Sequence, residues 1–130
     1  MLICCRRPIL GPMLLYLASD LLWATRVKAL ADDLKIPARP VRSIEMLDAR
    51  LADSPVQALV VDLESEVAIE LISHLRNAKP GVRILCFAPH VKKDVMEAAR
   101  QAGAHEVLPR GAFDSNMAQI LQRLASVQNQ

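Results

Sequence analysis

Residues capable of chemistry stand directly after four apolar runs of the chain. The clearest case is Asp62, which ends the run Ala-Leu-Val-Val at 58–61 in the middle of the sequence. If these runs are parallel strands, their carboxyl ends gather at one edge of a sheet, where open α/β sheets place their sites. The residues expected to meet there are Ser19, Asp20, Asp62, Glu64, Ala88, His90 and Arg110.

The roles of these residues stay open at this point. Asp62 either takes part in chemistry or serves as scaffold, by capping the turn that follows it or by pairing with Arg110. Asp20 fits a helix N-cap better than a metal ligand, because a helix start needs a side-chain acceptor. Three interpretations are open for His90: it lines a ligand site, it acts as a group that changes charge near neutral pH, or it stays solvated in its loop.

Five apolar segments predict the strands that position this edge. Three are continuous runs, as expected of strands buried on both faces of a parallel sheet. Another contains Pro40, which confines it to an edge of the sheet. The predicted strands are 13–18, 38–42, 57–63, 82–87 and 105–108.

Apolar residues at helical spacing predict a helix after each strand. N-caps are available at Ser19 or Asp20, at Ser43, and at Asp114 or Ser115. Five β-α units joined by short links predict a fold of the α/β class, a doubly wound (βα)5 arrangement around a single five-stranded parallel sheet.

Length and composition limit the classes of function. The 130 residues fit one domain at 13–126 after a loose extension at 1–12, with the start at Met1 or Met13 left open. Aromatic residues make up 3%, and the 16 basic and 14 acidic residues are spread along the chain, so we expect no nucleic acid partner. No apolar stretch reaches the ~20 residues that span a bilayer, so no membrane is expected.

Cysteine spacing and the missing catalytic motifs further limit the cellular setting and the function expected of the chain. The three cysteines lack metal or disulfide spacing, which predicts a reducing, cytoplasmic setting. The four glycines do not cluster into a phosphate-binding loop, and no G-x-S-x-G elbow is present. We therefore expect no enzymatic activity.

Three segments resemble the receiver domain of two-component response regulators. They are Val-Val-Asp-Leu at 60–63, Ala-Ala-Arg-Gln-Ala-Gly-Ala at 98–104 and Val-Leu-Pro-Arg at 107–110. The likeness extends from Met13 to about Leu124 and implies the flavodoxin-like receiver fold.

The resemblance also implies a role for Asp62. This residue matches the aspartate that accepts a phosphoryl group in the family. The acidic pair that helps to hold magnesium falls on Ala18-Ser19, or on Ser19-Asp20 if the register slips by one residue. Magnesium prefers carboxylate oxygens in octahedral geometry, so the loss of one or both acids weakens its binding. Asp20 and Asp62 remain as weak candidate ligands for Mg²⁺, the one cofactor that a functional site would need.

Two further positions depart from the family. Ala88 stands where a hydroxyl residue ends the fourth strand, and Arg110-Gly111 replaces a Lys-Pro pair. Alanine cannot donate a hydrogen bond to an acyl phosphate. Arginine keeps the positive charge with a different geometry, and a direct pair with Asp62 would imitate the modified state. These departures predict a pseudo-receiver with degraded phosphorylation chemistry.

A pseudo-receiver would act through protein-protein contact. The family pairs through the surface that corresponds to the helix at 92–102, the strand at 105–108 and the last helix. The expected partner is a sensor kinase or another signalling protein, or a second copy of the chain in a homodimer.

Two alternatives belong to other classes. An atypical response regulator would be phosphorylated on Asp62 with weak magnesium support from Asp20 and Glu64. A flavodoxin-like binding module would instead hold a small ligand, such as an anion near Arg110 and His90.

Overall fold

The computed structural model describes residues 13–89 and 91–126. The expected extension at 1–12 and the candidate residue His90 lie outside the described residues. Within the described part, no helix is both long enough and apolar enough to cross a membrane.

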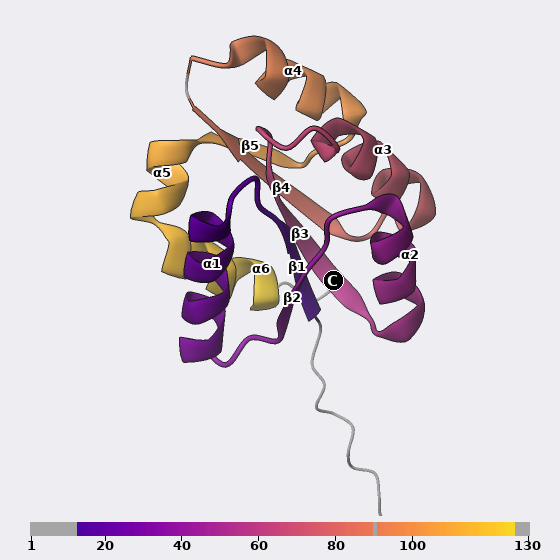
Figure 1. The fold of residues 1–130 in the computed structure, drawn as a ribbon, viewed down its shortest axis with the longest axis vertical. Coiled ribbons are helices and arrows are strands. Elements are labelled where there is room, and N and C mark those ends of the chain that lie inside the picture. Colours follow the sequence, from indigo (N-terminus) through magenta and orange to yellow (C-terminus); the bar gives the residue numbers. More distant parts are fainter. Residues whose placement is uncertain (1–12, 90, 127–130) are drawn as a thin grey trace, which may run out of the picture.

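The five predicted strands form one parallel sheet in the order β2-β1-β3-β4-β5 (Figure 1). The fold class predicted from the sequence is therefore confirmed. The strand that contains Pro40 lies at an edge, as its missing amide donor requires. The strands are β1 (Met13–Leu17), β2 (Ala38–Pro40), β3 (Val56–Asp62), β4 (Arg83–Ala88) and β5 (Glu106–Pro109).

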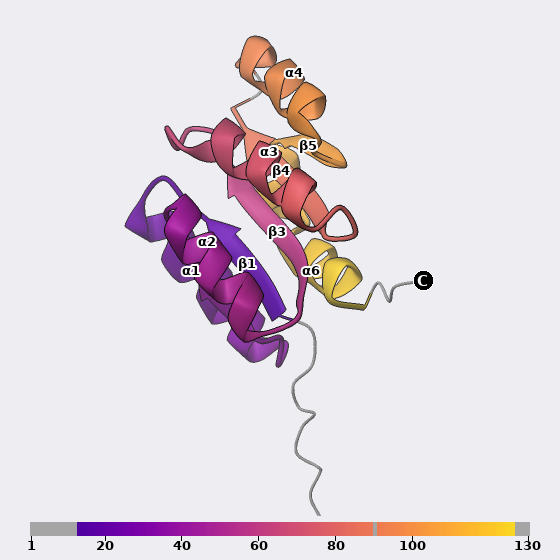
Figure 2. The ribbon, with the colours of Figure 1, turned by 90° about the vertical axis from the view of Figure 1, so that its right-hand side faces the viewer.

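Helices cover both faces of the sheet, and each face has its own hydrophobic core. One layer holds α1, α5 and α6, and the other holds α2, α3 and α4, which Figure 2 shows from their own side. The helices are α1 (Leu21–Asp33), α2 (Ile44–Asp53), α3 (Ala68–Ala78), α4 (Lys93–Ala102), α5 (Arg110–Ser115) and α6 (Met117–Ser126).

Two predicted N-caps are confirmed. The Asp20 carboxylate accepts a hydrogen bond from the amide of Trp23 at 2.9 Å, and the Ser43 hydroxyl accepts one from the amide of Met46 at 3.1 Å. Each bond satisfies an amide that the first helical turn leaves without a partner. Asp20 thereby holds the start of α1 directly after β1.

The start of the last helix differs from the prediction. Asp114 and Ser115 do not cap it, because both lie within the additional helix α5, and α6 begins at Met117. Helical structure directly after β5 brings Phe113 into the core, where its ring stacks on Phe87 with centroids 4.3 Å apart. Asp114 instead forms an ion pair with Arg26 of α1.

The buried strands β1, β3 and β4 contain almost only apolar side chains. Cys86 of β4 is a buried free thiol, and burial raises its pKa to about 12, so it behaves as the small hydrophobic residue that the sequence predicts. Asp62 differs from the other polar residues of these strands in being buried: among the described residues it is the one polar or charged residue that is.

The predicted interior of β3 is testable at Val60, which is 1% exposed. We expect Val60→Asp to cost several kcal/mol of unfolding free energy, because it buries a carboxylate without a partner. Arg39→Asp on the exposed side of the edge strand β2 is the matched control, and should change stability by about 1 kcal/mol or less. Urea unfolding measures both, and a Val60→Asp protein with wild-type stability would contradict the strand assignment.

A second prediction concerns the β4–β5 edge. His105 Nδ1 accepts a hydrogen bond from the amide of Ile84 at 3.0 Å. Partial burial lowers the pKa of His105 below its ordinary value of 6.5, and the positive charges of Arg83 and Arg76 lower it further. The negative charge of Glu106 acts in the opposite direction. The unfolded chain therefore takes up the proton first, and this contribution to stability is lost as the pH falls below 6.5.

We expect His105→Asn to reduce the loss of unfolding free energy below pH 6.5. The side-chain oxygen of asparagine accepts the same hydrogen bond but does not titrate. The measurement is the free energy of unfolding of both proteins between about pH 8 and pH 5. Parallel profiles for the two proteins would show that His105 does not contribute.

Candidate functional site

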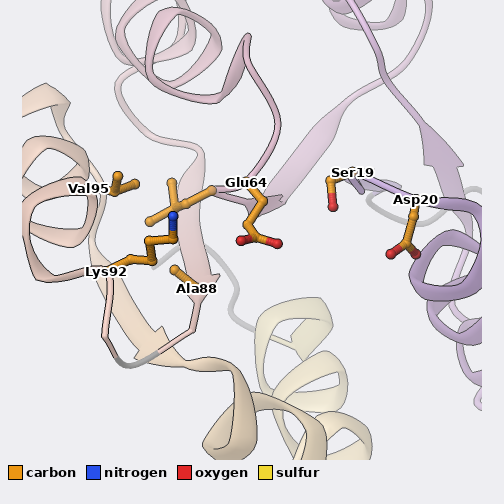
Figure 3. Close-up of a pocket in the computed structure, with 7 residues that line it drawn as sticks. Ser19, Asp20, Glu64, Ala88, Lys92 and Val95 are labelled. Atoms are coloured by element: carbon orange, nitrogen blue, oxygen red, sulfur yellow. The ribbon is translucent and has the colours of Figure 1, made fainter.

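An open cleft of about 580 Å³ lies at the carboxyl edge of the sheet. Ser19 and Asp20, directly before α1, line one side, and Lys92 and Val95, at the start of α4, line the other. The carboxylate of Glu64 is directed into the space between them (Figure 3). Four of the predicted site residues belong to this lining. Its residues are Ser19, Asp20, Leu63, Glu64, Ala88, Lys92 and Val95.

Asp62 is held by three hydrogen bonds at the centre of this edge. Its Oδ2 accepts from the backbone amide of Ser19 at 3.0 Å and from the Ser19 hydroxyl at 2.5 Å. Its Oδ1 accepts from the backbone amide of Glu64 at 3.0 Å. Both carboxylate oxygens are therefore engaged, and the side chain is 0% exposed. The capping role that the sequence leaves open for Asp62 is present in the structure.

Arg110 pairs with a different carboxylate from the one expected. Its Nη2 lies 3.0 Å from Glu64 Oε1, so the predicted pair with Asp62 is replaced by a pair with Glu64. The reason is burial: Ser19 covers Asp62, whereas the carboxylate of Glu64 is partly exposed. An ion pair at the surface avoids the desolvation that a buried pair would require.

The guanidinium of Arg110 also lies over the ring of Trp23, with 5.5 Å between Cζ and the ring centroid. Arg26 approaches the same ring at 5.1 Å. Trp23 in turn packs on Phe87 and Phe113 in the core, as its place in the apolar stripe of α1 predicts. Arg26 lies three residues after Trp23 on the same helix, so its contact is local. Arg110 comes from a distant element, and nothing in the sequence indicates that it meets this ring.

Ala88 ends β4 beside the cleft, as predicted. Its methyl group offers no hydrogen-bond donor, and it is 1% exposed. The nearest cation on the α4 side of the lining is Lys92. Among the residues that the structure describes, the polar side chains of this lining are those of Ser19, Asp20, Glu64 and Lys92.

The two candidate magnesium ligands, Asp20 and Asp62, both take part in hydrogen bonds of the fold. The carboxylate of Asp20 caps α1, and that of Asp62 is buried under Ser19. Within residues 13–89 and 91–126, no group of three His, Cys, Asp or Glu side chains comes together closely enough to hold a metal ion. Magnesium usually relies on carboxylates that face an open, hydrated position. The carboxylates that line the cleft here are those of Asp20 and Glu64, and Glu64 is paired with Arg110.

Comparison with known proteins identifies the fold. No family model and no curated protein sequence matches the chain. Among solved structures, a response regulator from Thermotoga maritima is 17% identical with a TM-score of 0.73, over 91% of this chain and 100% of that one. A Burkholderia pseudomallei response regulator, solved with a phosphorylated aspartic acid, calcium ion and citrate, is 17% identical with a TM-score of 0.69, over 92% of this chain and 76% of that one.

A third structure is the beryllofluoride-activated NtrC4 receiver domain dimer, which is 12% identical with a TM-score of 0.67, over 86% of this chain and 98% of that one. These similarities, together with the strand order, establish that the chain has the fold of response-regulator receiver domains.

The bonds around Asp62 lead to a stability prediction. Asp62→Asn replaces one of the two acceptor oxygens by an NH₂ group, which is a donor. This group then faces the donors of either Ser19 or Glu64, so at least one hydrogen bond is lost. We expect a loss of about 1–3 kcal/mol in unfolding free energy. The control is Asp33→Asn, a neutralisation at an exposed position of α1, which should stay within about 0.5 kcal/mol. Urea denaturation that finds equal, small losses would show that the three bonds do not stabilise the fold.

Proposed function

We propose that this chain is a receiver-like signalling domain that acts through protein-protein contact and whose Asp62 does not serve as a phosphoacceptor. The observation that carries the proposal is the burial of Asp62, whose two carboxylate oxygens are both occupied by hydrogen bonds from the loops after β1 and β3.

Burial opposes phosphoryl transfer for a geometric reason. A carboxylate oxygen that attacks phosphorus must approach roughly in line with the leaving oxygen, so it has to be open on one side. The Ser19 hydroxyl occupies that approach at Oδ2, and the Glu64 amide occupies Oδ1. The developing charge would also have a weaker metal site, because one carboxylate oxygen of Asp20 is used to cap α1 and the strand-1 position before it is Ser19.

The contacts of Arg110 support an output that needs no phosphoryl group. Through Glu64 and Trp23, this side chain connects the start of α5 with the loop after β3 and with α1. In our proposal these contacts hold the carboxyl edge in one arrangement permanently. The surface that a partner meets then depends on the presence of the protein and not on its modification.

The expected partner is a sensor kinase or another signalling protein. The surface formed by α4, β5 and the helices after it is the first candidate for that contact, because the resemblance to receiver domains implies it. A groove of about 540 Å³ lies on this surface, lined by Lys93, Met96, Glu97, Arg100 and Pro109. NtrC4 forms a receiver domain dimer, so a homodimer belongs to the same proposal.

A second candidate function is an atypical phosphoacceptor. It is favoured by the position of Asp62 at the carboxyl end of β3, next to a cleft whose lining includes Asp20 and Glu64. This function requires Ser19 to move away from Asp62 before the chemistry begins. The third alternative, a small-ligand module, stays a prediction.

Beryllofluoride, which mimics an acyl phosphate, separates the first two functions. With Asp62 buried and magnesium poorly held, we expect no saturable change in the amide NMR spectrum at millimolar magnesium and beryllofluoride. The resonances to follow are those of Asp62, Ala88 and Arg110.

The matched control is the Asp62→Asn protein under the same conditions. It corrects for any effect of magnesium on exposed carboxylates elsewhere in the chain. A saturable shift in the wild-type protein that disappears in Asp62→Asn would overturn the proposal and establish the phosphoacceptor in its place.

A further inference from the structure

Large apolar side chains flank the cleft on two opposite sides. Leu21 and Leu22, 78% and 66% exposed, directly follow the lining residue Asp20, and Val91, 71% exposed, directly precedes the lining residue Lys92. Among the described residues these three are the exposed large hydrophobic side chains. All three are exposed to solvent and are sequence neighbours of lining residues at the carboxyl edge, and exposed apolar side chains grouped in this way favour an interaction surface.

The same two sides carry opposite charge. Asp20 stands with Leu21 and Leu22 at the start of α1, and the carboxylate of Glu64 lies between the sides (Figure 3). Lys92 and Lys93 stand with Val91 at the start of α4, with Asp94 next to them. We name the first group, 20–22, the acidic side and the second, 91–93, the basic side.

The start of α4 is electrostatically unfavourable in the isolated chain. Helix N-termini carry partial positive charge and unpaired amide donors, so cations are destabilising there. Lys92 is the N-cap of α4, and it makes no side-chain capping bond. Lys93 adds a second cation in the first turn, which Asp94 only partly offsets. A carboxylate supplied from outside would relieve this charge.

We infer that the carboxyl edge of the sheet pairs with the same edge of a second copy of this chain. A two-fold axis that runs along the cleft places the acidic side of one copy against the basic side of its partner, and the reverse contact follows by symmetry. Leu21 and Leu22 of one copy then cover the partner's Val91. The Asp20 carboxylate of each copy then adds to Asp94 in offsetting the cations at the start of the other copy's α4.

Self-complementarity is what favours a second copy over another protein. The surface contains both members of each contact, apolar against apolar and acid against base, so no outside group is needed to satisfy it. This inference rests on the proposed function, since it names the partner of a domain that works by protein contact. It differs from the α4–β5 surface in using the loops after β1 and β4.

Sedimentation velocity of the full chain, from about 5 to about 200 µM at low salt, tests the inference. We expect a concentration-dependent shift from the 14.3 kDa monomer to a species of twice that mass. Leu22→Gln and the double variant Lys92→Glu/Lys93→Glu should each raise the dissociation constant by about tenfold or more. The charge reversal improves the start of α4, so loss of the dimer cannot be attributed to misfolding.

Two further variants sharpen the result. Asp20→Asn keeps a capping side chain but removes the charge, so it should weaken the dimer while leaving the fold intact. Arg100→Glu is the matched control on the α4–β5 groove, and it should leave the dissociation constant unchanged within about twofold.

A chain that stays monomeric over the whole range overturns the inference, and so does a dimer that Arg100→Glu disrupts while Leu22→Gln does not. Neither result affects the proposed function, because the beryllofluoride experiment does not depend on pairing.

Discussion

The hydrogen bonds that Ser19 and Glu64 donate to the buried carboxylate of Asp62 are the constraint on which the carboxyl edge depends. A buried carboxylate is tolerated in a protein only when hydrogen bonds satisfy the lone pairs of its oxygens. Here the satisfying donors come from the loops after β1 and β3, so the same three bonds that make burial possible also join these loops. Release of Asp62 would therefore cost stability and loosen the edge together.

A second group of contacts makes this arrangement continuous with the core. Arg110 connects Glu64 with the ring of Trp23, and Trp23 packs against the stacked rings of Phe87 and Phe113. The ion pair of Arg110 and Glu64 is thus in contact, through these rings, with both α1 and α5. With so few aromatic residues in the chain, their concentration at this one place ties the edge of the sheet to the packing below it.

The sequence was sufficient to predict the sheet, because the patterns that indicate its strands are local and strong. The unbroken apolar runs and Pro40 predicted the strands and the edge position of β2, and Asp20 and Ser43 were correct as caps. The partners at the site were harder to predict. The ion pair of Arg110 with Glu64 depends on how deeply Ser19 covers Asp62, which is a property of the folded loops. The helix α5 was missed for a similar reason, since burial of Phe113 decides it.

The centre and the sides of the carboxyl edge place opposite demands on the chain. At the centre a carboxylate is shielded from water, although exposure would be needed for it to react. At the sides Leu21, Leu22 and Val91 are exposed, although burial would stabilise them. In the proposed function, the centre does not react and loses nothing when its charge is shielded, whereas exposed apolar side chains give an advantage only when something covers them. The proposed function and the inferred pairing are therefore consistent with one another, since both assign contact and not chemistry to this edge.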